Sequence, residues 1–196
     1  MTSTGFVKAE DRAAHAARII ALQMMEERGR GAVLVGVARV DSALEHLLEA
    51  VMTPGLSKSD RLFLPDKPLG SLGAKVALAS RLGLLDPQVE RALQVLRKLR
   101  NAFAHSTESA SLNDPPHRER LANVYSDARL NPLWHSLETA LTTQAPVAQP
   151  PLEPALINFI LLITILVAFL EAVAHQQEPF KPSVMMRFSQ ESQSEH

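Results

Sequence analysis

The chain has 196 residues, of which 46% are hydrophobic, 21% charged and 5% aromatic, and this composition excludes disorder over the whole length and fits a single folded domain. Twenty basic and twenty-one acidic residues give a net charge of −1, so any binding of nucleic acid or of an anionic membrane requires a local basic patch. The absence of cysteine excludes disulfides, thiolate metal sites and cysteine nucleophiles.

Apolar residues recur at intervals of three and four over most of the chain, which predicts an all-α, single-domain bundle of five to seven helices. After a flexible polar tail (residues 1–9), a first helix is predicted from Glu10 to Arg28, where Gly29 and Gly31 interrupt it. A second helix is predicted from Ala32 to Met52. Its core-facing stripe consists of Val33, Val37, Val40, Leu44, Leu47, Leu48 and Val51.

Two further helices have clear start signals. Ser71 is a typical N-cap residue and predicts a short helix that ends at Leu82. Asp86 followed by Pro87 predicts the next helix, because aspartate accepts hydrogen bonds from the free amides and proline fits the first helical position. This fourth helix is expected to end near His105, where the sequence becomes polar.

The remaining chain predicts two shorter helices, at residues 118–128 and 132–144, a proline-rich connector at 145–154 and an apolar last helix at 155–174. A membrane span needs about 18–20 apolar residues, whereas the uncharged run covers only residues 155–170 and lacks a basic flank and an aromatic belt. We expect residues 155–174 to form the central helix of the bundle; association of this segment with a membrane is the alternative. The predicted bundle domain therefore covers residues 10–177, and a polar tail covers 178–196.

Most catalytic signatures are absent. The sequence has no phosphate-binding glycine loop, no nucleophile elbow, no paired metal-binding histidines and no helix-turn-helix or zinc-finger pattern. We therefore expect no cofactor, no metal and no sequence-specific DNA binding. Residues 1–17 carry charges where a secretory signal needs an apolar core, which favours a cytoplasmic protein.

The local basic patch lies at the end of the fourth predicted helix. Arg97, Asn101 and His105 are four residues apart and therefore share a helix face, with Arg100 beside it and Lys98 next in sequence. A guanidinium, an amide and an imidazole near one another can bind a phosphate and move a proton. The pattern predicts a phosphodiester site with catalytic residues Arg100, Asn101 and His105 and substrate-binding residues Arg97 and Lys98.

The run Arg100-Asn101-Ala102-Phe103-Ala104-His105 resembles the Arg-x4-6-His motif of the HEPN superfamily, whose small helical domains include many metal-independent ribonucleases. The resemblance implies a homodimer in which the arginines and histidines of two subunits meet, and a reaction in which a ribose 2′-hydroxyl attacks the adjacent phosphate. His105 would move the proton, Arg100 would stabilise the phosphorane, and Asn101 would orient the pair. Relatives controlled by a nucleotidyltransferase antitoxin carry a tyrosine two residues after the histidine; Thr107 stands here, so such control is not expected.

A second resemblance, to the mannitol operon repressor family, rests on three stretches of sequence. They are Pro68-Leu69-Gly70-Ser71-Leu72-Gly73-Ala74-Lys75, then Leu82-Gly83-Leu84-Leu85, and then residues 96–105. This resemblance implies a helical regulator that binds a protein partner, with the glycines serving packing or turns and the basic patch facing an acidic partner. Two functions therefore stay open: a toxin-like or defensive endoribonuclease that cleaves single-stranded RNA, and a non-catalytic transcriptional regulator.

The charged residues also have a structural interpretation. Arginine and histidine late in a helix complement its dipole and cap free carbonyls, which would explain Arg97, Lys98, Arg100 and His105 without a ligand. Asn101 is less easily explained in this way, because asparagine is a poor interior helix residue. Asp41 and Glu45 are expected either to order the basic residues across the bundle or to form an exposed acidic face.

Overall fold

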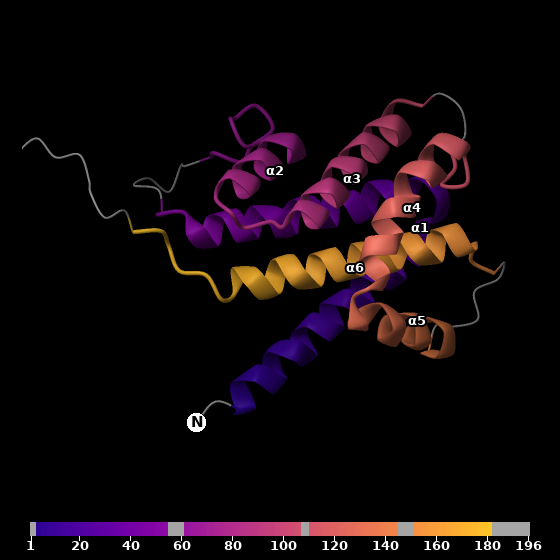
Figure 1. Cartoon of the computed structure of the whole chain (residues 1–196), viewed down its shortest axis with the longest axis horizontal. Coiled ribbons are helices and arrows are strands. Elements are labelled where there is room, and N and C mark those ends of the chain that lie inside the picture. Colours follow the sequence, from indigo (N-terminus) through magenta and orange to yellow (C-terminus); the bar gives the residue numbers. More distant parts are fainter. Residues whose placement is uncertain (1–2, 55–60, 107–109, 145–150, 182–196) are drawn as a thin grey trace, which may run out of the picture.

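The two helices predicted around the glycines are arms of one bent element, α1 (Ser3–Val51). Arg28 (φ 48°) and Gly29 (φ 44°, ψ −126°) have non-helical backbone angles, so the break falls where the sequence places it. Figure 1 shows the first arm running toward this bend and the second arm returning alongside α6 (Pro154–Ala174). The helix begins at Ser3 rather than at the predicted Glu10.

The computed structural model describes residues 3–54, 61–106, 110–144 and 151–181, and within these ranges it describes the side chains of residues 19–141 and 151–181. These residues form six helices and no strand, which confirms the all-α bundle. Besides α1 and α6, the helices are α2 (Leu72–Arg81), α3 (Pro87–His105), α4 (Pro115–Arg129) and α5 (Pro132–Gln144). Thr107, the connector residues 145–150 and the tail residues 182–196 lie outside the described part of the chain.

Local capping chemistry sets the ends of α2 and α3 as predicted. The Ser71 hydroxyl accepts a hydrogen bond from the third amide of α2 at 3.2 Å, and Gly83 takes a left-handed conformation (φ 71°) just after its end. The Asp86 carboxylate accepts hydrogen bonds from the second and third amides of α3, at 2.7 and 2.9 Å, and Pro87 occupies the first helical position. These caps fix the start of the two helices that flank the predicted site.

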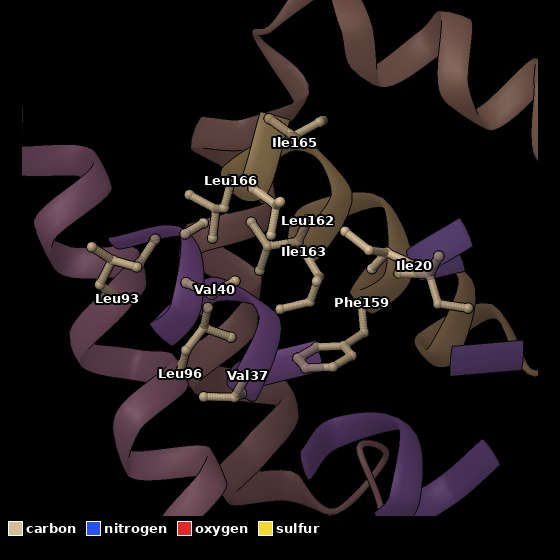
Figure 2. Packing of buried hydrophobic residues seen from close by; sticks show 14 of the residues in the cluster. Ile20, Val37, Val40, Leu93, Leu96, Phe159, Leu162, Ile163, Ile165 and Leu166 are labelled. Atoms are coloured by element: carbon tan, nitrogen blue, oxygen red, sulfur yellow. The ribbon is translucent and has the colours of Figure 1, made fainter. Parts of the chain in front are cut away.

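The apolar helix α6 is the centre of the bundle and packs most extensively against α1. Figure 2 shows its residues among side chains from both arms of α1 and from α3. The fully buried members of α6 are Phe159, Ile160, Leu161 and Ile163. In length and composition α6 is able to cross a bilayer, but 61% of its most apolar 18-residue stretch is buried, which fits the central helix of the bundle.

Gly36 brings three helical segments together at the middle of α1. A Cβ at this position would stand 2.8 Å from the Met24 methyl group on the first arm and 3.1 Å from Ile163 Cγ1 on α6. Because glycine has no side chain, the second arm of α1 can approach both the first arm and α6 closely at this position. Beyond α6, the Phe180 amide donates a hydrogen bond of 2.8 Å to the Val51 carbonyl and holds the chain against the end of α1.

Two phenylalanines on α6 provide a direct test of its role in the core. Phe159 is fully buried, whereas Phe169 is 43% exposed. We expect Phe159→Ala to lower the free energy of unfolding by about 3–5 kcal/mol, because it removes a large side chain from a packed interior, and Phe169→Ala to lower it by about 1 kcal/mol. Urea denaturation of both variants measures the difference; equal losses would show that α6 does not bury this face.

Candidate functional site

An open hollow of about 610 Å³ lies between the second arm of α1, the start of α2 and the last turns of α3. Arg97, Arg100 and Asn101 line it from α3, so three of the five predicted site residues face one space. The opposite wall comes from Asp41 on α1 and from the turn and first residues of α2, Gly70, Ser71 and Gly73. The hollow therefore lies between the basic patch of α3 and the glycine-rich stretch of residues 68–75, which the sequence analysis identified independently of each other.

The other two predicted residues, Lys98 and His105, are exposed on α3 and are not among the residues that line the hollow. Helix geometry explains why, since each residue turns the helix by about 100° and a five-residue step therefore separates Arg100 from His105 by about 140°. His105 lies one turn beyond Asn101 on the same face. Within one chain, Arg100 and His105 consequently project in different directions.

Arg97 is held in place by its neighbours on both sides. Its Nε donates a hydrogen bond of 3.0 Å to Gln94 Oε1 on the preceding turn of α3. On the other side, its Cδ would stand only 3.2 Å from a Cβ at Gly73, so the glycine leaves room for the arginine stem. The arginine is half-buried, which makes its position less variable than that of the exposed Arg100.

Gly70 allows the turn before α2 to close on itself. A Cβ at this position would lie 2.0 Å from the carbonyl oxygen of Leu64, which is backbone and unable to move aside. The same carbonyl accepts a hydrogen bond of 2.8 Å from the Lys67 amide, and the Gly70 amide donates one of 2.9 Å to the Lys67 carbonyl. The turn therefore presents Ser71 and the start of α2 to the hollow.

Lys75 is a buried cation, only 3% exposed, that joins α2 to α1. Its ammonium lies 2.6 Å from Glu45 Oε2 and 2.9 Å from Asp41 Oδ1, and it stands 5.9 Å from the centre of the Phe63 ring. These carboxylates therefore pair with Lys75 rather than with Arg100 or His105, and because each is only about one third exposed they do not form the exposed acidic face that was the alternative expectation. The sequence does not reveal this pairing, because the three residues meet only after α2 packs on α1.

The ion pairs change the proton affinity of Lys75. Burial is the largest single influence and lowers the pKa, but the hydrogen bonds to Glu45 and Asp41 and the charges of both carboxylates together outweigh it. The pKa of Lys75 is therefore raised above its ordinary value of 10.5. Lys75 stays charged at neutral pH and neutralises the acid that faces the hollow.

Arg30 caps the end of α3 from the bend in α1. Its guanidinium donates hydrogen bonds of 2.9 Å to the Ala104 carbonyl and 3.2 Å to the Ser106 carbonyl. Capping by an arginine from a different helix was not expected from the sequence, where the only signal is a basic residue between two glycines. Because Arg30 takes these carbonyls, His105 is not needed to cap them.

The described residues contain no group of three or more histidine, cysteine, aspartate or glutamate side chains arranged to hold a metal ion. A buried histidine also lies near α3: His117 on α4, whose ring centre lies 5.2 Å from that of Phe103. His117 belongs to the core beside α3 and does not line the hollow. The polar groups available in the hollow are therefore guanidinium, amide and hydroxyl groups, together with the Asp41 carboxylate that is paired with Lys75.

Comparison of the chain with protein-family models, with curated proteins and with solved structures gives no match.

Two glycines at the edge of the hollow are expected to differ in their tolerance of a methyl group. Gly70→Ala should lower the free energy of unfolding by about 2–3 kcal/mol, because the new Cβ meets a backbone carbonyl. Gly73→Ala should cost less than about 1 kcal/mol, because the flexible Arg97 stem can shift by a few tenths of an ångström. Chemical denaturation measures both values, and a larger loss in Gly73→Ala would contradict this description of the turn.

The contribution of Lys75 is expected to depend on pH. Lys75→Met leaves two facing carboxylates, each about one third exposed, so we expect a loss of about 2 kcal/mol at pH 7, reduced by solvent screening. The folded-state pKa lies above the unfolded value of 10.5, so this stabilisation is complete below pH 10.5 and is lost as the pH rises through the raised pKa. The gap between wild type and Lys75→Met in urea denaturation should therefore narrow above pH 10.5.

Lys67, whose side chain is 46% exposed beside Asp66, is the matched control for Lys75. Lys67→Met should change the free energy of unfolding by less than about 0.5 kcal/mol at either pH, because an exposed pair contributes little. An equal effect of the two substitutions would mean that the Lys75 pairs do not tie α2 to α1.

Proposed function

We propose that this chain is a metal-independent endoribonuclease of HEPN type that cleaves single-stranded RNA in the cytoplasm, at a site completed by a second copy. One observation carries the proposal. Arg97, Arg100 and Asn101 line one open hollow at the end of α3, while His105 stands exposed one turn beyond Asn101. A hollow lined by two guanidiniums is suited to a phosphate, since arginine offers a planar fork of donors.

The reaction follows from the groups at this end of α3. His105 accepts the proton of a ribose 2′-hydroxyl, whose oxygen attacks the adjacent phosphorus. The P–O5′ bond breaks, and the leaving 5′-oxygen takes up a proton from a protonated histidine of the site. Arg100 stabilises the added negative charge of the phosphorane, and Asn101 orients the phosphate. The products are a 2′,3′-cyclic phosphate and a 5′-hydroxyl, and no metal is required.

The divergence of Arg100 and His105 is the reason for a composite site. The two side chains are separated by about 140° around the helix, so one chain does not aim both at the same phosphorus. A twofold axis beside α3 would bring the His105 of one copy to the Arg100 of the other. The homodimer is thus part of the proposed mechanism.

The capping of α3 by Arg30 supports a chemical role for His105. Since Arg30 bonds the carbonyls of Ala104 and Ser106, the histidine is left exposed at the helix end. An exposed imidazole is able to accept and donate a proton in general acid–base catalysis. The structural interpretation, in which His105 caps its own helix, is correspondingly weaker.

A non-catalytic regulator that binds an acidic protein partner is the second candidate function. The observation that favours it is the exposed Lys98, which extends the basic surface of α3 beyond the residues that line the hollow. A surface wider than one phosphate suits a partner with several carboxylates.

The ribonuclease proposal is tested by incubating the purified protein with a mixed single-stranded RNA in excess EDTA. We expect cleavage into products with 5′-hydroxyl and 2′,3′-cyclic phosphate ends, and no cleavage of the same sequence as DNA. His105→Ala should reduce the rate by about 10²–10⁴-fold, as loss of a general base does, and Arg100→Ala by about 10²–10³-fold, as loss of transition-state stabilisation does.

The matched control is His135→Ala, because His135 is a highly exposed histidine on a different helix, α5, with an 89% exposed side chain. This variant should cleave RNA at the wild-type rate. Absence of cleavage by a folded wild-type dimer would favour the regulator, and equal cleavage by all variants would assign the activity to a contaminant. A monomer that cleaves at full rate would contradict the composite site.

A further inference from the structure

The junction of α3 and α4 lies outside the hollow, since α4 contributes no residue to the lining of the hollow and packs along another part of α3. The two helices run in opposite directions. Arg91, near the start of α3, pairs with Asp127 near the end of α4 at 2.9 Å. Phe103, near the end of α3, contacts His117 near the start of α4. Because the helices touch at both ends, helix geometry identifies which residues of α3 and α4 face each other between these contacts.

Lys98 and Arg120 face each other across this junction. Lys98 lies seven residues after Arg91, which is two turns of helix and returns to the same face of α3. Arg120 lies seven residues before Asp127 and therefore shares its face of α4. Because the helices are antiparallel, both steps lead in the same direction from the ion pair, over about 10 Å. The two cations consequently stand opposite each other, and both are exposed.

No carboxylate neutralises these two cations. Within the described part of the chain, neither side chain forms an ion pair or a hydrogen bond. An intrahelical partner would stand three or four positions away, and none of those positions is acidic. They hold Gln94, Val95, Asn101 and Ala102 around Lys98, and Pro116, His117, Asn123 and Val124 around Arg120. Like charges that face each other repel, so an anion bound between them is favoured.

We propose that Lys98 and Arg120, together called the α3–α4 basic strip, bind the phosphate backbone of the single-stranded RNA beside the point of cleavage. The proposal rests on the ribonuclease function for the identity of the strand. His105 lies seven residues beyond Lys98 on the same face of α3, so the strip leads to the proposed general base over about 10 Å. One phosphate of the strand lies at the composite site, and neighbouring phosphates lie on the strip.

The surroundings of the strip suit a phosphate backbone better than a protein surface. The centre of a protein interface is rich in aromatic and large apolar side chains, and neither α3 nor α4 exposes one. The same absence means that no aromatic ring on these two helices is available for a base to stack on. The strip therefore contacts phosphates only, and we expect it to bind RNA without regard to sequence.

The strip is tested with a fluorescently labelled 2′-O-methyl RNA, which keeps the phosphates but lacks the attacking hydroxyl. This probe reports binding whether or not the protein cleaves RNA. Fluorescence anisotropy at increasing salt gives the slope of log K against log salt concentration, which is about −0.7 per phosphate contact for a single strand. Lys98→Gln combined with Arg120→Gln should therefore make the slope shallower by about 1.4. Lys98→Arg combined with Arg120→Lys preserves both charges and should keep the wild-type slope.

The matched control is Arg61→Gln combined with Arg81→Gln. These exposed arginines lie before α2 and in its last turn, so the control removes the same charge away from the strip. Its slope should equal that of the wild type. An equal change of slope in the control and in the strip variant would overturn the proposal, because the effect would then come from net charge alone.

Cleavage of unmodified RNA separates this proposal from the ribonuclease function. In an active enzyme the strip variant should raise KM and leave kcat unchanged, since it loses binding that substrate and transition state share. Binding that depends on the strip without any cleavage would support the strip and refute the ribonuclease. Normal cleavage with an unchanged slope would refute the strip alone. A wild-type protein that binds a polyglutamate peptide more tightly than the probe would also overturn the strip, in favour of an acidic protein partner.

Discussion

The burial of α6 is the interaction on which the rest of the structure depends. A helix with a long uncharged run exposes too much apolar surface to stand alone in water, and burial of about 25 cal/mol per Å² favours covering it. The bend at Arg28 and Gly29 allows both arms of α1 to contact it, and Gly36 brings the arms and α6 close together. Once the second arm of α1 is fixed on α6, it becomes the surface on which α2 and α3 pack.

The candidate site is held by residues outside it. Lys75 ties α2 to α1 through Asp41 and Glu45, and Arg30 ties the end of α3 to the bend in α1. The walls of the hollow are therefore held together by ion pairs between α1 and α2 and by hydrogen bonds between α1 and α3. Lys75 and Arg30 make the contacts that hold the walls together, so Arg100 and Asn101 remain exposed to solvent in the hollow.

Local signals predicted the helices well, because they act over a few residues. The Ser71 and Asp86 caps and the apolar period of α3 are visible in sequence and are confirmed in the structure, as is the break near Gly29. The periodicity also placed Arg97, Arg100 and Asn101 near one another, and they share the hollow. Contacts between residues far apart in the sequence were not predictable. Nothing in the sequence distinguishes Lys75 from an ordinary surface lysine. The need for glycine at position 70 becomes visible only when the Leu64 carbonyl is seen to lie against it. The roles of Arg100 and His105 rest on a family resemblance and stay predictions.

The hollow shares α3 with a second, apolar groove of about 270 Å³, which is lined by the start of α3, by Leu47 on α1 and by Leu166 and Phe169 on α6. Because both lie on one rigid helix, the ways in which they can influence each other are limited. The hollow uses α3 from Arg97 onward and the groove uses it up to Ala92, so about 8 Å of helix separates them. Between them, Leu93 and Leu96 are fully buried in the core. Coupling between two sites requires an element with two alternative arrangements, and a helix locked by such packing offers only one. Filling the apolar groove would therefore leave the hollow unaltered, so the basic hollow and the apolar groove can serve separate purposes on the same helix.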